Sequence, residues 1–149
     1  MKNLILSAAV MFVLTISAAA AATEPSNAKV VKTFNEVFKA AHDVKWTTTG
    51  NYYMAFFTVD GIKIRAILDA KGNLVQTIRY YTENNLPANV LYHVKHDFPG
   101  KEVWGVTEVT NNNGVNYRIV LRDNKSYIHI NANSLGESEI AKKYKRGDK

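Results

Sequence analysis

The dipeptide Asp60-Gly61 constrains the fold of this chain more than any other short segment. A two-residue type I′ turn needs positive φ at both positions, which Asp-Gly tolerates, so residues 59 and 62 should face each other across a hairpin. Extending that register outward gives one nearly apolar face, which should receive a helix: Tyr53, Ala55, Phe57, Val59, Ile62, Ile64, Ala66 and Leu68. The opposite face mixes aromatic, aliphatic and basic side chains, and is not an ordinary solvent face: Tyr52, Met54, Phe56, Thr58, Lys63, Arg65, Ile67 and Asp69.

A helix-like segment followed by strand-like runs occurs twice. Apolar residues at helical spacing predict a helix over residues 28–41 and a shorter one that begins at Pro87. Runs rich in β-branched and aromatic residues, separated by turn residues, follow over 44–81 and 103–131. We therefore predict an α+β fold in which each helix packs on antiparallel sheet.

The two stretches also match loosely at the residue level. Val44-Lys45-Trp46 resembles Glu102-Val103-Trp104, and Asp60-Gly61 resembles Asp123-Asn124. We interpret the pattern as a tandem repeat, with units over about 28–86 and 87–141, inside one domain that spans 23–149. After Asp123-Asn124 the alternation leaves two registers open; burial of apolar area favours Ile128 and Ile130 inward over Tyr127 and His129.

The N-terminal segment has the features of a secretory signal. Lys2 precedes an apolar run from Leu4 to Ile16, and small residues follow up to Ala22. We predict a signal peptide over residues 1–22, cleaved after Ala22, and a periplasmic or secreted protein without stable membrane insertion, because the apolar run is shorter than the ~20 residues that span a bilayer. The sequence has no cysteine, which excludes disulfides, thiolate metal sites and a lipid-modified cysteine.

The net charge of +6 is a modest basic excess. Part of it lies in the tail, which we expect to be a solvated and partly frayed end: Lys142, Lys143, Lys145, Arg146 and Lys149. A basic surface favours an acidic protein partner or anionic lipid, or serves solubility alone. Export argues against nucleic acid as a ligand.

Patterns that could support catalysis or metal binding are weak. His93, His96 and Asp97 lie within one turn of the second predicted helix, but a solvated polar face explains them. Residues 69–73 faintly resemble a calcium loop, although a hairpin with glycine in the left-handed conformation explains them better. Glu102 and Glu108 could form a carboxylate pair, but strand edges often carry such residues. No nucleophile elbow or zinc-binding helix motif is present, so we predict no catalytic, cofactor or metal residues and no enzymatic activity.

The mixed sheet face is the strongest functional candidate. Rigid aromatic area combined with cations is typical of the centres of protein interfaces, and we predict protein-binding residues at Trp46, Tyr52, Phe56, Arg65 and Trp104. The alternative is that the second repeat or a partner subunit covers this face as core.

The order and spacing of these motifs resemble the β-lactamase-inhibitor-like, PepSY-like family of exported bacterial proteins. The motifs are Ala41-x-x-Val44-Lys45-Trp46, Tyr53-x-Ala55-x-Phe57, Ala66-Ile67-Leu68-Asp69-x-x-Gly72, Leu86-Pro87-x-x-Val90, Phe98-Pro99-Gly100, Val106-x-Glu108-Val109 and Gly114-x-x-Tyr117. The resemblance implies a periplasmic protein of two helix-plus-sheet repeats, similar to an inhibitor that grips an enzyme with its sheet, and it implies no established activity.

Three hypotheses follow. The first is a non-enzymatic periplasmic binding or inhibitor-like module that contacts a protein partner in the cell envelope through the aromatic and basic sheet face. The second is a small-ligand or envelope-stress sensor with an apolar pocket between the repeats, and the third is an enzyme with an unrecognised site. The sequence leaves the oligomeric state open.

Overall fold

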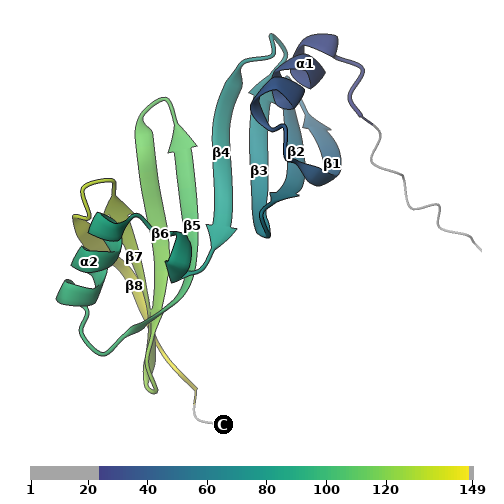
Figure 1. Cartoon of the computed structure of the whole chain (residues 1–149). Coiled ribbons are helices and arrows are strands. Elements are labelled where there is room, and N and C mark those ends of the chain that lie inside the picture. The colour runs from purple at the N-terminus through teal and green to yellow at the C-terminus, as the bar shows by residue number, and fades with distance from the viewer. Residues whose placement is uncertain (1–23, 148–149) are drawn as a thin grey trace, which may run out of the picture.

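The computed structural model describes residues 24–147, so the predicted signal segment lies outside the described residues. Eight antiparallel strands form one sheet in the order β1-β2-β3-β4-β5-β6-β7-β8, and two α-helices cover one of its faces (Figure 1). The predicted α+β fold, with helices packed on antiparallel sheet, is therefore confirmed. Within residues 24–147, no helix has the length and apolar character needed to cross a membrane.

Each helix precedes four strands that are joined by short turns. The first set is α1 (Ala28–Val37), β1 (His42–Thr49), β2 (Tyr52–Val59), β3 (Ile62–Asp69) and β4 (Leu74–Tyr81). A 3-10 turn, η1 (Glu83–Asn85), leads to the second set: α2 (Ala88–Asp97), β5 (Glu102–Asn111), β6 (Gly114–Arg122), β7 (Ser126–Asn133) and β8 (Ser138–Lys145). Pro87 is the residue before the first turn of α2 rather than its first helical residue, and its fixed φ suits that place.

The β2–β3 hairpin has the predicted register. Asp60 and Gly61 have φ values of 50° and 76°, and Val59 pairs with Ile62. The predicted apolar face lies under α1, where Ala55, Ala66 and Leu68 are fully buried. Phe34 of α1 enters this core and packs edge-on against two rings, 4.9 Å from Trp46 and 5.1 Å from Phe57; each such pair adds about 0.5–1.5 kcal/mol beyond area burial.

α1 ends at Val37, four residues before the predicted end at Ala41. Phe38 leaves the helical conformation, with φ −113° and ψ 56°, and its ring packs 4.8 Å from that of Phe57. Residues 38–41 were predicted as helix because their apolar spacing fits one, but they form the turn that brings the chain down to the sheet. Burial of the Phe38 ring against the core therefore outweighs one further helical turn.

The second half has its own core beneath α2. Val90 and Val94 of the helix are buried against the sheet, and Ile128 and Ile130 of β7 point inward with 4% and 1% exposure. The predicted inward register of the two isoleucines is confirmed, and His129 is exposed on the other side.

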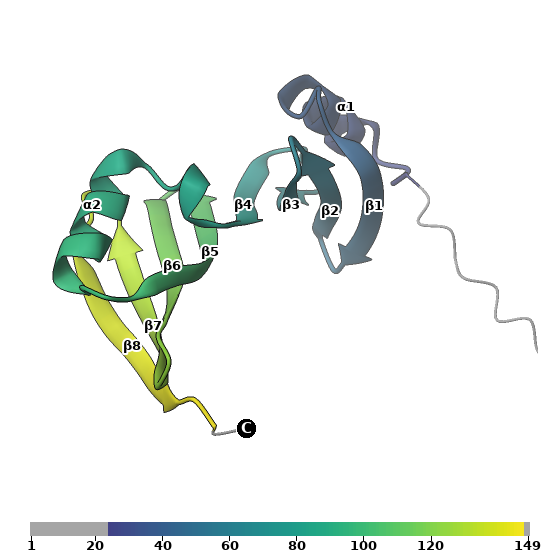
Figure 2. The same ribbon diagram turned by 60° about the horizontal axis from the view of Figure 1, so that its bottom comes forward.

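Both helices lie on the same face of the sheet. Ile64, under α1, pairs with Arg79 of β4, Arg79 pairs with Glu108 of β5, and Glu108 pairs with Tyr117, under α2. Residues paired directly across neighbouring strands point to the same side, so this row connects the two covered faces. Figure 2, in which the sheet is turned, shows both helices on one side of a curved sheet.

The C-terminal tail differs from the prediction. Lys142, Lys143 and Lys145 belong to β8, which pairs with β7 from Ser126–Lys145 to Ala132–Ser138, so this segment is an edge strand and not a frayed end. Backbone pairing to β7 orders it, and lysine is common on such edges because it discourages pairing with other chains.

The turn before β8 repeats the turn before β4. In residues 69–73 and 133–137, the N–H of the first residue donates to the carbonyl of the fifth at 3.0 Å, and the fourth residue is a glycine with φ of 87° or 90°. In both turns the first side chain accepts two backbone N–H groups, from Lys71 and Asn73 or from Leu135 and Glu137. Each turn also holds its helix, since Asn27 donates to the carbonyl of Ala70 and Asn89 to that of Ser134.

Candidate protein-binding surface

The face of the sheet opposite the helices, called here the open face, carries the mixed residues singled out from the sequence. One row across the first five strands consists of Lys45, Phe56, Arg65, Ile78 and Val109. The second half continues the sheet edge to edge through the β4–β5 pairing, and within the described residues it does not fold back over this face. The alternative that the second half covers the face is therefore wrong.

Most exposed aromatic side chains lie on the open face. Register and contacts place five there: Tyr52 (50% exposed), Phe56 (39%), Tyr80 (44%), Trp104 (52%) and Tyr144 (41%). Ile78, in the middle of the sheet, is only 6% exposed because its neighbours on the same face surround it. The face thus combines a buried isoleucine with exposed aromatic rings, and aromatic side chains are enriched in interface cores.

The structure brings three predicted residues together in the first half of the open face. Tyr52 and Phe56 project from β2, and Arg65 of β3 pairs with Phe56 and places its guanidinium 5.9 Å from the ring centroid. Burial of the Arg65 Nε leaves that atom without a hydrogen-bond partner within the described residues.

Trp104 lies in the second half. β5 has a bulge between Val103 and Gly105, so Trp104 has no cross-strand partner, and the guanidinium of Arg122 lies 3.4 Å from its ring centroid. Arg122 also forms an ion pair with Glu102 (Nε to Oε2, 2.8 Å), which lowers the pKa of the Glu102 carboxyl. Trp104 is therefore an exposed ring, positioned from one side by a fixed cation.

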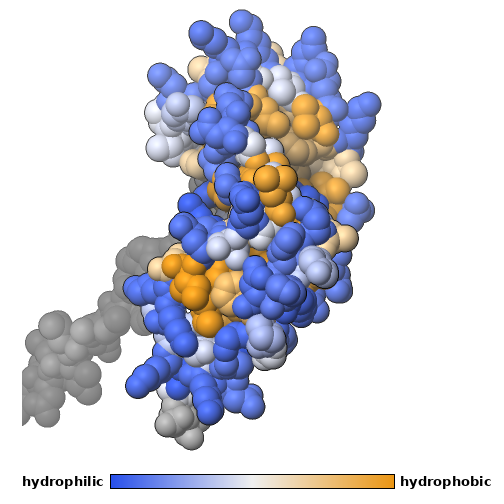
Figure 3. Space-filling model, turned by 90° about the vertical axis from the view of Figure 1, so that its left-hand side faces the viewer, coloured by the Kyte–Doolittle hydropathy of each residue, from blue (hydrophilic) through white to orange (hydrophobic). Residues whose placement is uncertain are grey.

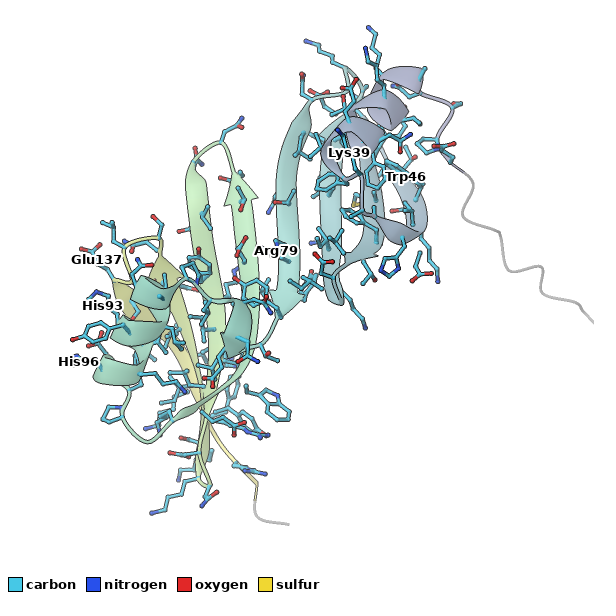
Figure 4. The ribbon with its side chains drawn as sticks, in the orientation of Figure 1. Lys39, Trp46, Arg79, His93, His96 and Glu137 are labelled. Atoms are coloured by element: carbon cyan, nitrogen blue, oxygen red, sulfur yellow. The ribbon has the colours of Figure 1, made fainter. Side chains whose placement is uncertain are left out.

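Trp46 is not part of this surface. It pairs with Ala55 on the helix side, is 9% exposed and packs on Phe34 (Figure 4). The match between Trp46 and Trp104 is misleading because bulges in β1, between His42 and Lys45, and in β5 shift the alternation differently. We correct this prediction: Trp46 is a core residue.

Sequence reasoning missed several open-face residues. Tyr80 and Arg118 lie in one row with Lys63, and Tyr144 of β8 pairs with Tyr127. The alternation within residues 74–81 contains the signal for Tyr80, but only a known β3–β4 register places it next to Lys63.

A polar cluster joins the two halves on the helix side. Glu108 is 8% exposed; its Oε2 accepts a 2.5 Å hydrogen bond from the Tyr81 hydroxyl, and Nη1 of Arg79 lies 3.1 Å from its Oε1. Burial of the Tyr81 hydroxyl is the larger cause, and its hydrogen bond to the Glu108 carboxylate the smaller one, that raises the pKa of Tyr81 well above its usual range. Arg79 lies where the two halves meet (Figure 4).

Solved structures with similar folds were found, whereas no known family model and no curated protein matches this chain. A BLIP-like protein from Bacteroides fragilis has a TM-score of 0.63 at 20% identity, covering 85% of this chain and 92% of its own. The chain has the BLIP-like fold. A DUF2874 family protein from Bacteroides ovatus (TM-score 0.63, 18% identity, 83% and 89% coverage) and a protein from Bacteroides eggerthii that is provisionally described as periplasmic (0.61, 19%, 83% and 89%) share it. The predicted resemblance to β-lactamase-inhibitor-like proteins is thus confirmed at the level of the fold.

The remaining sequence candidates occupy separate places on this BLIP-like fold. His93 and His96 are exposed on α2, and His96 Nδ1 lies 2.8 Å from the neighbouring Asp97 (Figure 4). Within the described residues, no group of three or more His, Asp and Glu side chains is placed to share a metal ion. Glu102 lies on the open face and Glu108 on the helix side, so the two carboxylates do not meet.

The Asp69 carboxylate is occupied by its own turn. It accepts hydrogen bonds from the Asn73 side chain (2.8 Å) and from the backbone N–H groups of Lys71 and Asn73, and the same hydrogen bonds lower its pKa. In the BLIP-like fold this turn ties β3 and β4 to the start of α1.

The side of the BLIP-like fold that carries α2 and β8 has only small, separate apolar patches (Figure 3). Figure 3 shows these patches set among hydrophilic residues. The exposed large apolar residues Tyr92, Leu135 and Ile140 are scattered over α2, the β7–β8 turn and β8. Scattered apolar residues are normal on a protein surface, so this side offers a weaker candidate than the open face.

Proposed function

We propose that this protein is a non-enzymatic binding module of the cell envelope that holds a protein partner against the open face of its sheet. One observation supports this most: within the described residues, the open face is uncovered and carries the exposed rings of Tyr52, Phe56, Tyr80, Trp104 and Tyr144. A monomeric protein rarely exposes so much aromatic area on one face without a use for it.

The residues of the open face suit protein recognition better than catalysis. Aromatic rings and arginine dominate interface hot spots because they bury large area with few rotatable bonds and add directional polar contacts. We propose Tyr52, Phe56 and Arg65 as one group of anchors and Trp104 with Arg122 as a second, each group on its own half of the sheet. Two groups would let the curved sheet contact a partner across its full width.

The fold neighbours agree with this function in general terms. One is named as BLIP-like, that is, like an inhibitor protein, and another is provisionally described as periplasmic. We infer the same compartment here, with residues 1–22 as a signal peptide cleaved after Ala22 and residues 23–149 as the mature domain. Inhibition of an enzyme would be one use of such a surface.

We further infer that the two helix-plus-four-strand units are a tandem repeat. The matched turns at 69–73 and 133–137 support it, because they share the glycine position, the backbone hydrogen bonds and the contact to the helix. A duplicated unit offers two similar half-surfaces to a partner.

Site-specific photo-crosslinking tests the proposal. A photoreactive phenylalanine analogue is placed at Phe56, at Trp104 and, as the control, at Tyr92, which is 66% exposed on the helix side. We expect the open-face positions to give a defined protein adduct in intact cells and Tyr92 to give none. Adducts at Tyr92 alone, or none at any position, would contradict the proposal.

A further inference from the structure

The basic side chains in the first half of the open face lack partners. Lys45 and Lys63 are exposed and Arg65 is half-buried, and none of the three forms an ion pair within residues 24–147. Two carboxylates of β5 are paired with arginines: Glu102 with Arg122 and Glu108 with Arg79. One carboxylate, that of Asp43, lies near them and contacts His42, so three unpaired cations against this one carboxylate give this part of the face a net positive potential.

These cations surround a ring. Lys45 on β1 and Arg65 on β3 both pair with Phe56 on β2. Neighbouring strands lie about 4.8 Å apart, so the Cα atoms of Lys45 and Arg65 are about 10 Å apart, with Phe56 between them. Lys63 lies in the next row, between Thr58 and Tyr80.

The two lysines and Phe56, but not Arg65, line a depression of about 330 Å³. Lys45, Phe56, Lys63 and Tyr80 contribute to it, together with Asp43, whose carboxylate is 2.8 Å from the His42 ring nitrogen. The depression is large enough for one or two side chains, and it combines apolar walls with ammonium groups.

We propose that this depression binds an acidic segment of a protein, in which one aromatic or aliphatic side chain packs on Phe56 and Tyr80 while flanking carboxylates meet Lys45 and Lys63. This inference rests on the proposed function and names the chemistry of the partner. A bilayer surface is a poorer fit, because polybasic lipid-binding surfaces use clusters of about 4–8 cations and a flat surface does not enter a depression.

The test uses two blocked peptides, Gly-Glu-Phe-Glu-Gly and Gly-Gln-Phe-Gln-Gly, titrated into the purified ¹⁵N-labelled protein. Amide shifts report both affinity and location. We expect the glutamate peptide to shift amides of β1 to β4 and to bind more weakly as salt is added, because exposed ion pairs are screened. Lys63→Glu and Lys45→Glu should each weaken it by about five- to tenfold. Lys39→Glu, the same change in the turn after α1, should have no such effect.

Three results would overturn the acidic-segment inference. Equal binding of both peptides on the open face would remove the acidic requirement and leave the proposed function intact. Binding of neither peptide would remove the inference, while the crosslinking at Phe56 and Trp104 judges the proposed function separately. Binding of phosphatidylglycerol vesicles that Lys63→Glu abolishes, without peptide binding, would identify an anionic lipid surface instead.

Discussion

Replacing Tyr81 with phenylalanine removes the hydroxyl group of a hydrogen bond that joins the two halves of the sheet. Tyr81 is 9% exposed, and its hydroxyl donates to the Oε2 atom of Glu108, which is 8% exposed. The ring, and with it the apolar packing, remains in Tyr81→Phe. The substitution therefore isolates the donor.

The expected cost follows from the surroundings of Glu108. A hydrogen bond to a charged group contributes about 1.5–3 kcal/mol to stability. When a buried carboxylate loses its donor, water cannot readily replace the lost hydrogen bond. Arg79 remains 3.1 Å away but is 35% exposed, so it retains part of the neutralisation. We expect Tyr81→Phe to lower the free energy of unfolding by about 2 kcal/mol, or to lower Tm by roughly 6–10 °C.

Urea unfolding followed by circular dichroism measures this cost. The control is Tyr80→Phe, because Tyr80 is 44% exposed on the open face, where loss of a hydroxyl should cost under about 0.5 kcal/mol. In a Glu108→Gln background the Tyr81→Phe cost should fall to about 1 kcal/mol, because the acceptor is then neutral. Equal costs for the two tyrosines, or an unchanged cost in the Gln background, would refute the role assigned to this cluster.

Three further predictions concern stability. Gly72→Ala should lower the unfolding temperature more than Gly61→Ala. Both positions have positive φ, but an added Cβ at Gly72 would lie 2.9 Å from the Lys29 carbonyl oxygen, whereas the space at Gly61 is open; thermal melts with the opposite ranking would contradict this. The pKa of Asp123 is lowered by its ion pair with Lys101, so its stabilisation should be complete above about pH 4 and be lost as pH falls below that value; Asp123→Asn should unfold at a lower temperature than the wild type at pH 7, with a gap that narrows in acid. The pKa of Tyr81 is raised, so its stabilisation should be complete below about pH 10 and decline above it, and alkaline melts should show a smaller decline for Tyr81→Phe.

Features that depend on local chemistry could be predicted from the sequence. The Asp60-Gly61 turn fixes its hairpin by backbone conformation alone, so the register and both faces of β2 and β3 follow from the sequence. The inward register of Ile128 and Ile130 followed from transfer energy. Both inferences depend on the residues of one hairpin or one strand and need no knowledge of distant pairing.

Features that depend on distant pairing were missed. The pairing of β4 with β5 joins the two halves into one sheet and leaves the face opposite the helices open. No short sequence motif predicts this pairing. The sequence predicted equivalent positions for Trp46 and Trp104, but because of bulges in β1 and β5 they lie on opposite faces of the sheet. We did not predict β8 because residues 142–146 are so basic that they resemble a solvated tail. The turn before it was a usable signal, since Gly136 occupies the same position there as Gly72 does in the turn before β4.

The most direct test of the central claim is retention of a cell-envelope protein on immobilised protein. The Tyr52→Ala, Phe56→Ala, Arg65→Ala variant removes two exposed apolar groups and a cation from the open face. A Tyr92→Ala, Val37→Ala, Lys39→Ala variant removes a similar set from the helix side, where Tyr92 and Val37 are 66% and 52% exposed. With folding of each variant checked by circular dichroism, we expect the wild type and the helix-side variant to retain the same protein and the open-face variant to lose it. Equal retention by all three, or loss on the helix-side variant alone, would show that the open face is not the binding surface.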